Sequence, residues 1–226
     1  MQNKTINRRL IWAFVFNLTI FILEIIGLVL SVEKHGLRVF KYYTENSNYF
    51  ALIVSAIFCI SCVNSIKNNA KIPDWVFKLR YISTLCLTIT FVIVTLVLVP
   101  MFPNSFYYMW FESSSLYQHL LCPVISIISF LLFENSIILN RKTIFFALIP
   151  TILYGVISII LNLLKLMAGP YPFFYVYDIP WFVCVFSLTA IVLGSALIAF
   201  VIYKIYNYGY KNFNYSFNLQ NKKIEP

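Results

Sequence analysis

The stretch LIWAFVFNLTIFILEIIGLVLSV, residues 10–32, decides the class of this protein. It follows Lys4, Arg8 and Arg9 and contains a single charged side chain, Glu24. About 20 consecutive apolar residues are enough for a helix to cross a bilayer. The stretch is too long for the apolar part of a cleaved signal peptide, and no A-x-A cleavage pattern follows it. We therefore expect it to remain in the chain as a membrane-spanning signal-anchor helix.

The composition of the whole chain points the same way. Of its 226 residues 61% are hydrophobic and only 11% are charged, with a mean hydropathy of +0.81, whereas a soluble domain has about 25% charged residues. The sequence predicts an all-α integral membrane protein, a six-helix transmembrane bundle forming a single domain over residues 1–206. A polar tail, residues 207–226, is expected to be loosely ordered. The predicted helices are 10–32, 45–66, 79–101, 116–134, 143–166 and 180–204.

Basic residues predict the orientation. Of the 17 Lys and Arg residues, 13 lie in the N-terminus, the second and fourth loops and the tail. Because positive residues are enriched in cytoplasmic loops, both termini are predicted to be cytoplasmic. The first loop, with Lys34, Arg38 and Lys41, is the exception. The net charge of +9 is explained by contacts with anionic lipid, so no nucleic-acid partner is expected.

This topology brings three polar clusters to the outer end of the bundle. Residues 43–48 (YTENSN) open the second predicted helix, His119 lies near the start of the fourth, and residues 171–178 (YPFFYVYD) connect the fifth to the sixth. The clusters are far apart in sequence, and the charge count alone places them at one depth.

Thr44, Ser47 and Asn48 share one helix face, since they lie at i, i+3 and i+4. One interpretation is that these side chains only cap the first N–H groups of the helix. However, Asn48 would lie a full turn inside the membrane, where a buried amide needs a partner or a function.

His119 lies four residues before Pro123. Proline has no N–H, so the carbonyl of His119 loses its usual helical partner and the helix should open locally. If the helix instead begins nearer Leu120, Pro123 is a first-turn proline and nothing opens. A single histidine at a membrane interface can be an ordinary amphipathic residue, but ionisable groups within the membrane are functional candidates.

Threonine is a weak nucleophile that needs a base. An imidazole with an ordinary pKa of about 6.5 suits that role near neutral pH, so Thr44 and His119 are a candidate pair of nucleophile and base. Asp178 is the one acid in the third cluster; it either orients the imidazole or is a surface partner of Lys165 or Arg38. Candidates to bind an oxyanion are Asn48, Ser47 and Tyr43.

Arg38 and Lys41 precede Thr44 by six and three residues. Cations beside an outward-facing cleft attract a carboxylate or phosphate headgroup. The alternative is an ordinary contact with lipid headgroups at the membrane surface.

The five cysteines all lie in apolar segments, which is not the pattern of a disulfide framework. Cys122, one turn from His119, is an alternative nucleophile for a membrane acyltransferase. A metal site is not expected, because four ligands do not converge. No cofactor is expected either; a haem held by His35 and His119 has no supporting pattern.

Three short motifs resemble a known family: residues 43–48 read as Y-T-x-x-S-N, His119 followed by Pro123, and Tyr171-Pro172-Phe173 with a later acid. They are similar to the bacterial Pr6Pr membrane proteins, which resemble the eukaryotic androgen-induced and androgen-dependent TFPI-regulating family. Eukaryotic members are intramembrane threonine hydrolases that cleave fatty acid esters of hydroxy fatty acids. The resemblance covers most of the bundle.

Carried over by motif, the threonine and histidine of that family fall on Thr44 and His119. Two features depart from the family: the spacing from His119 to Pro123 is one residue shorter, and the acid, Asp178, stands further from the Tyr-Pro-Phe motif. These departures leave the role of Asp178 and the substrate open.

The leading hypothesis is thus a multi-pass bacterial plasma-membrane hydrolase that acts on a lipid ester. Its expected partners are membrane lipids, and the sequence does not predict the number of subunits. Two alternatives stay open. One is the acyltransferase that uses Cys122 and His119, and the other is a non-enzymatic lipid-binding or transport protein.

Overall fold

The regular elements in the described part of the chain are all helical. The computed structural model describes residues 8–222, without the side chains of Pro103 and residues 213–222. Six helices are long and apolar enough to cross a membrane, which confirms the predicted number. Four of them are formed by single elements, α1 (Arg8–His35), α2 (Tyr43–Asn68), α7 (Lys142–Leu163) and α8 (Trp181–Lys222).

The other two membrane-length helices contain π-helical turns. Helix α3 (Asp74–Ile93) continues through the π-helix η2 (Val94–Leu98) into the short α4 (Val99–Met101). Helix α6 (Cys122–Phe133) is preceded by the π-helix η4 (Leu116–Leu121). Four short helices lie in the connections between the long ones: η1 (Gly36–Lys41), η3 (Pro103–Ser105), α5 (Phe106–Trp110) and η5 (Pro172–Phe174).

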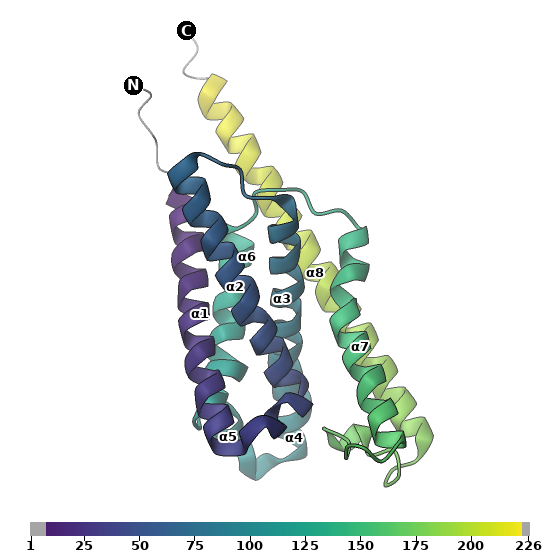
Figure 1. The fold of residues 1–226 in the computed structure, drawn as a ribbon. Helices are drawn as coiled ribbons and strands as arrows, with labels where there is room; N and C mark the ends of the chain where they lie inside the picture. The colour runs from purple at the N-terminus through teal and green to yellow at the C-terminus, as the bar shows by residue number, and fades with distance from the viewer. Residues whose placement is uncertain (1–7, 223–226) are drawn as a thin grey trace.

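The helices form two groups (Figure 1). Helices α1, α2, α3 and α6 make a four-helix bundle, and α7 and α8 form a hairpin that packs on α3 and α6. The start of α1 and the last turns of α8 lie at the same end, which we call the termini end. The opposite end, which carries η1, α5 and η5, is called the loop end.

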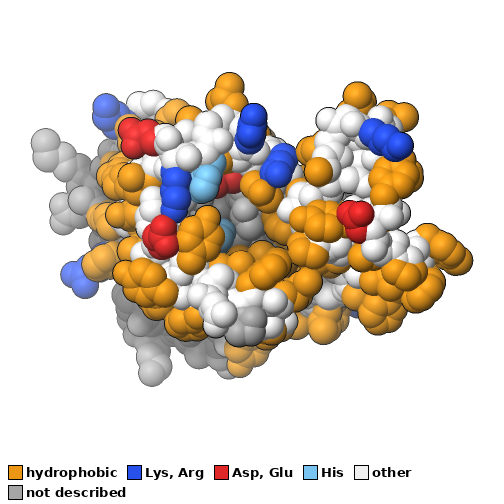
Figure 2. Space-filling view, turned by 90° about the horizontal axis from the view of Figure 1, so that it is seen from below, with side chains coloured by type: hydrophobic (Ala, Val, Ile, Leu, Met, Phe, Trp, Pro, Cys, Tyr) orange, Lys and Arg blue, Asp and Glu red, His pale blue; other side chains and the backbone are white. Residues whose placement is uncertain are grey.

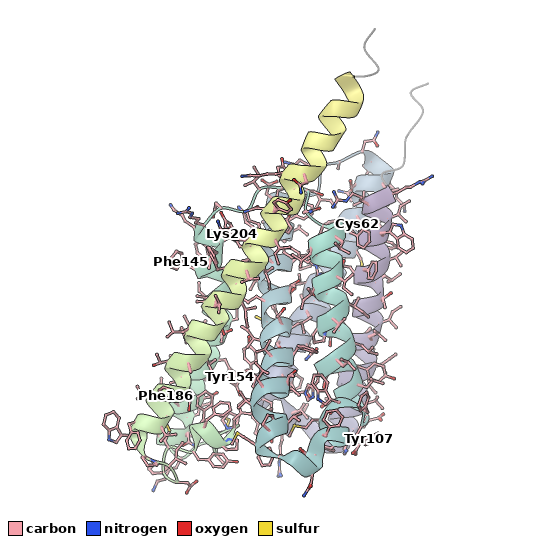
Figure 3. The ribbon with its side chains drawn as sticks, turned by 180° about the vertical axis from the view of Figure 1, so that it is seen from behind. Cys62, Tyr107, Phe145, Tyr154, Phe186 and Lys204 are labelled. Carbon is pink, nitrogen blue, oxygen red and sulfur yellow. The ribbon has the colours of Figure 1, made fainter. Side chains whose placement is uncertain are left out.

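The outward faces of the helices are apolar. Phe145 on α7 and Phe186 on α8 (Figure 3) are about three-quarters exposed, at 73% and 74%. Large exposed apolar side chains also line α1 and α2, such as Trp12 and Ile60. Exposed apolar surface of this extent on helices of membrane length is the surface that a multi-pass membrane protein presents to lipid.

A buried ion pair holds the interior of the bundle near the termini end. The Nε of Arg80 on α3 donates to Oε2 of Glu134 at 2.9 Å, and its Nη2 donates to Oε1 at 3.0 Å; both side chains are fully buried. Asn17 on α1 and Ser129 on α6 also donate to Oε1, at 2.8 Å and 2.6 Å. One carboxylate therefore joins α1, α3 and α6. Arg80 was counted among the basic residues of the second loop when the orientation was predicted, but it lies inside the bundle.

Helix α8 is longer than the sequence predicted. It continues to Lys222, beyond its predicted end at residue 204, and residues 223–226 lie outside the described part. Its extension is held by the segment after α6. The phenol of Tyr206 donates to the carbonyl of Glu134 at 3.0 Å, and the Asn207 amide bonds both backbone groups of Leu139, at 2.9 and 3.0 Å.

Removing either partner of the buried ion pair should strongly destabilise the fold. We expect Arg80→Met and Glu134→Gln each to lower the free energy of unfolding by about 3–5 kcal/mol, because the remaining group is buried without its partner. The double variant Arg80→Met/Glu134→Leu should recover most of this loss. The measurement is unfolding of purified protein in detergent. The matched control is Lys71→Gln, which breaks the exposed pair with Asp74 and should cost about 1 kcal/mol or less; similar losses in control and buried variants would contradict the assignment.

Candidate functional site

A cavity of about 670 Å³ opens at the loop end of the molecule. Figure 2 shows this end as a hollow, with histidine side chains inside it and Lys and Arg side chains around its edge. The lining comes from α1, η1, the start of α2, α5, η4 and the α7–α8 loop. Its polar and charged lining residues include Lys34, His35, Arg38, Lys41, Thr44, Glu45, Gln118, His119 and Tyr171.

Thr44 lies in the first turn of α2. Its side chain is largely buried, and its backbone N–H donates to the phenol oxygen of Tyr171 at 3.4 Å. The N-cap of α2 is Tyr42, which makes no side-chain capping bond. Asn46 makes the local contacts instead, donating to the carbonyls of Phe40 and Tyr42 at 2.7 and 2.8 Å. The capping interpretation of Thr44 is therefore wrong.

His119 lies in the π-helical turn η4, as the position of Pro123 predicted. Because Pro123 has no N–H, the helix widens here, and the N–H of Cys122 bonds the carbonyl of Tyr117, five residues back. The Nδ1 of His119 lies 2.8 Å from the carbonyl oxygen of Met109. A carbonyl only accepts, so Nδ1 carries a proton, and in the neutral imidazole Nε2 then keeps a lone pair. The imidazole is thus oriented as a base.

The structure brings Thr44 and His119 to the same cavity. Both line it, and they come from two different helices, α2 and η4. Among the described residues, no hydrogen bond joins these two side chains. Between their helices lies Asn48, whose Nδ2 donates to the carbonyls of Thr44 at 2.6 Å and Gln118 at 3.3 Å. The predicted pair therefore shares a site without being in contact.

Glu45 is a site residue that the sequence reasoning passed over. Its buried carboxyl accepts from Gln118 Nε2 at 2.7 Å and from the hydroxyl of Ser31. Gly27 permits this approach of α1 to η4, since a Cβ there would lie only 3.0 Å from Cγ of Gln118. Its position in the sequence could have indicated this, because an acidic residue next to Thr44 opens an otherwise apolar helix.

The cationic side of the cavity is provided by the end of α1 and by η1. Lys34 pairs with Glu112 at 2.6 Å. Arg38 and Lys41 line the cavity, and no described carboxylate lies within ion-pair distance of either; Lys41 lies over the ring of Tyr42. Two unpaired cations at the cavity edge form a site suited to an anionic group.

Three further residues that the sequence predicted to support the site are Ser47, Tyr43 and Asp178. Ser47 bonds the carbonyl of Thr44 at 2.9 Å and the hydroxyl of Thr90 on α3 at 2.8 Å. Tyr43 bonds the hydroxyl of Thr151 on α7 at 2.8 Å. Asp178 is exposed in the α7–α8 loop and does not line the cavity, so it does not orient His119. Among the described residues it also lacks the ion pair with Lys165 or Arg38 that was the alternative.

Tyr171 is the second residue that the sequence reasoning did not assign to the site. Its buried phenol lies against the backbone of Tyr43 and Thr44 and against the Thr44 hydroxyl. Burial raises the pKa of this phenol to about 12, although the contacts with the start of α2 oppose the shift. The phenol therefore stays protonated at neutral pH and can donate a hydrogen bond beside Thr44.

An apolar crevice begins where the polar cavity ends. Thr44 and Tyr171 line both spaces. The crevice, about 40 Å³, runs between the four-helix bundle and the α7–α8 hairpin; Tyr154, labelled in Figure 3, lines it from α7. A larger apolar groove of about 410 Å³ adjoins it along α8 and shares Phe173 with it. The site thus has a charged part and an apolar part, with Thr44 at their junction.

The cysteine alternative lacks this geometry. Cys122 is fully buried beside Glu24 and is not among the residues that line the cavity with His119. Over residues 8–222, no group of three or more His, Cys, Asp or Glu side chains lies close enough to hold a metal ion.

Comparisons with models of protein families, with curated proteins and with solved structures give no match for this chain. The resemblance to the Pr6Pr proteins therefore stays a prediction that rests on three short motifs.

Proposed function

We propose that the protein is an intramembrane hydrolase of lipid esters, with Thr44 as nucleophile and His119 as base. We further propose that both termini are cytoplasmic and that the membrane is a bacterial plasma membrane, as the basic loops and the composition predict. The cavity would then open to the outer side. One observation carries the proposal: Thr44 lies where a cationic cavity containing His119 meets an apolar crevice.

This junction fits an amphipathic ester. The acyl chain would lie in the crevice and in the groove along α8, both of which are lined mainly by apolar side chains. An anionic headgroup would lie near Arg38 and Lys41. The ester carbonyl, between the two parts, would then reach Thr44.

The chemistry follows from the orientation of each group. Nε2 of His119 takes the proton of the Thr44 hydroxyl as the oxygen attacks the carbonyl carbon, and the Met109 carbonyl holds Nδ1–H in place. The phenol of Tyr171 donates to the developing oxyanion. His119 then gives its proton to the leaving alcohol, and water hydrolyses the acyl-threonine. Thr44 and His119 must approach each other when substrate binds, which is common in sites without ligand.

A second candidate function is lipid binding without turnover. The observation that favours it is that Thr44 and His119 share no hydrogen bond. The cationic edge and the apolar crevice would then hold a headgroup and an acyl chain, and neither residue would act chemically.

Covalent labelling separates the two functions. A fluorophosphonate ester probe should label wild-type protein, and Thr44→Ala and His119→Gln should each abolish the labelling, because they remove the nucleophile and the base. The measurement is in-gel fluorescence of purified protein. The matched control is Thr189→Ala, which removes an exposed threonine of α8 and should label like wild type. Folded wild-type protein that binds lipid but never labels would establish the second function.

Cys122→Ser tests the acyltransferase alternative. We expect it to label and hydrolyse ester at the wild-type rate, because Cys122 is buried away from the cavity. The measurement is the rate of ester hydrolysis with a fluorogenic lipid. A variant that folds but has lost activity, together with a wild-type adduct on Cys122 in mass spectrometry, would replace threonine by cysteine as the nucleophile.

Headgroup recognition can be tested through Arg38 and Lys41. Each of Arg38→Gln and Lys41→Gln should raise KM for an anionic lipid ester roughly two- to fivefold with little change in kcat, because exposed charge pairs contribute about 0.2–1 kcal/mol. The effect should shrink at high salt and vanish with an uncharged ester. Lys142→Gln, at the termini end, is the control and should change nothing. An equal effect on charged and uncharged esters would show that the cations do not bind the headgroup.

A further inference from the structure

The interior of the four-helix bundle contains a row of carboxyl groups that the hydrolase mechanism does not use. On α1, the buried residues Asn17, Glu24 and Ser31 are separated by seven residues each, so they lie along one face. Ser31 bonds the carboxyl of Glu45, and Asn17 bonds the carboxyl of Glu134. Three carboxyl groups thus lie at three successive depths.

The depths follow from helix geometry. Seven residues at about 1.5 Å each separate neighbouring carboxyl levels by about 10 Å, and the two intervals together cover about 21 Å of a hydrocarbon core about 30 Å thick. Glu24 is in the middle of the row. Its neighbour across the bundle is the thiol of Cys122 on α6.

Polar side chains occupy both intervals between the carboxyls. Between Glu45 and Glu24 lie Asn48 and Gln118, which are bonded to each other through the Asn48 amide and the Gln118 carbonyl. Towards Glu134, the hydroxyls of Thr84 and Ser126 bond each other at 2.9 Å, and Ser126 lies 3.4 Å from Nη2 of Arg80. The bundle is therefore polar along its axis, while its outer face is apolar.

Apart from the weakly donating Cys122 thiol beside Glu24, hydrogen-bond donors are scarce in the middle of this row. Both carboxyl oxygens of Glu24, Oδ1 of Asn48, Oγ of Ser55 and Oδ1 of Asn17 are buried without a partner among the described residues. All of these residues are 1% exposed or less. All five atoms are oxygens on α1 or α2, and each of them can accept a hydrogen bond. Buried polar groups that only stabilise a fold are normally hydrogen-bonded, unlike these.

A cavity lies at each end of the row. Glu45 lines the cavity at the loop end. A second cavity, about 290 Å³, lies at the termini end and is lined by Arg9, Ala13 and Asn135. Asn17, which bonds Glu134, also donates to the carbonyl of Ala13 at 2.9 Å. Both ends of the row therefore adjoin a cavity.

We propose that the α1–α2–α3–α6 bundle carries protons between the two cavities, with Glu24 as the proton-binding group near mid-membrane. The Glu24 carboxylate takes a proton that water carries from the Glu45 side and becomes a neutral acid; the same proton then leaves through water towards Glu134, and only O–H bonds form and break. Ionisable side chains inside membrane proteins mark such relays.

The charged groups around Glu24 influence how readily it binds and releases a proton. Besides Glu24, the buried charged side chains among the described residues of the four-helix bundle are Glu45 on α2, Arg80 on α3 and Glu134 after α6, and Cys122 on α6 contacts Glu24. The charge of Arg80 opposes an additional proton beside Glu134. We therefore expect a slow relay rather than an open channel. This proposal does not depend on the hydrolase activity.

Proton uptake by reconstituted protein tests the proposal. Vesicles containing the full chain and loaded with potassium are given valinomycin, and a pH-sensitive dye reports acidification of the interior. Wild-type vesicles should acidify faster than protein-free vesicles, and Glu24→Gln should lose this difference. The matched control is Glu33→Gln, the same change at an exposed position of α1, which should take up protons like wild type.

Each other outcome is decisive. Uptake by folded wild-type protein no faster than by protein-free vesicles, or unchanged uptake in Glu24→Gln, would overturn the proposal. Uptake that requires external sodium would assign the row to a sodium ion instead, and would also overturn it. If Glu24→Gln does not purify as folded protein, Glu24→Asp decides the question: slower uptake supports the relay, and wild-type uptake contradicts it.

Discussion

The buried pair of Arg80 and Glu134 is the interaction on which the arrangement of the helices depends. A charge inside a membrane bundle must be paired, and the carboxyl of Glu134 also accepts bonds from Asn17 and Ser129. These bonds fix the relative depth of α1, α3 and α6. The backbone carbonyl of Glu134 holds α8 through Tyr206, so the same short segment positions the hairpin relative to the bundle.

The Arg80–Glu134 pair holds the helices together near the termini end. At the loop end, two of the helices depart from regular α-helical geometry. Two π-helical turns, η2 and η4, lie near this end, each beside a proline that cannot donate. They widen the helices that border the cavity, and η4 carries His119. The α7–α8 hairpin adds Tyr171 from outside the four-helix bundle. The proposed site therefore forms where the bundle and the hairpin meet, and the polar row lies inside the bundle, separate from the apolar crevice.

Much of this could be predicted from particular residues. The long apolar runs gave the six helices, and Pro123 indicated the local opening that η4 shows. The sequence analysis predicted that Thr44 and His119 lie at one end of the bundle, and both line one cavity. The roles of Ser47, Tyr43 and Asp178 could not be predicted, because a sequence gives the face of a helix and not its neighbour: the first two bond α3 and α7, and the third is exposed.

The sequence by itself determined the number of membrane-length helices and the end at which the polar clusters gather, since hydrophobic length and the order of helices and loops can be read along the chain. Only the tertiary structure decided which polar groups face one another. The pairing of Arg80 with Glu134, of Glu45 with Gln118, and of Thr44 with Tyr171 joins residues that are 54, 73 and 127 positions apart. Such contacts depend on how the helices pack and rotate, because within lipid it is packing and hydrogen bonding between helices that select their arrangement.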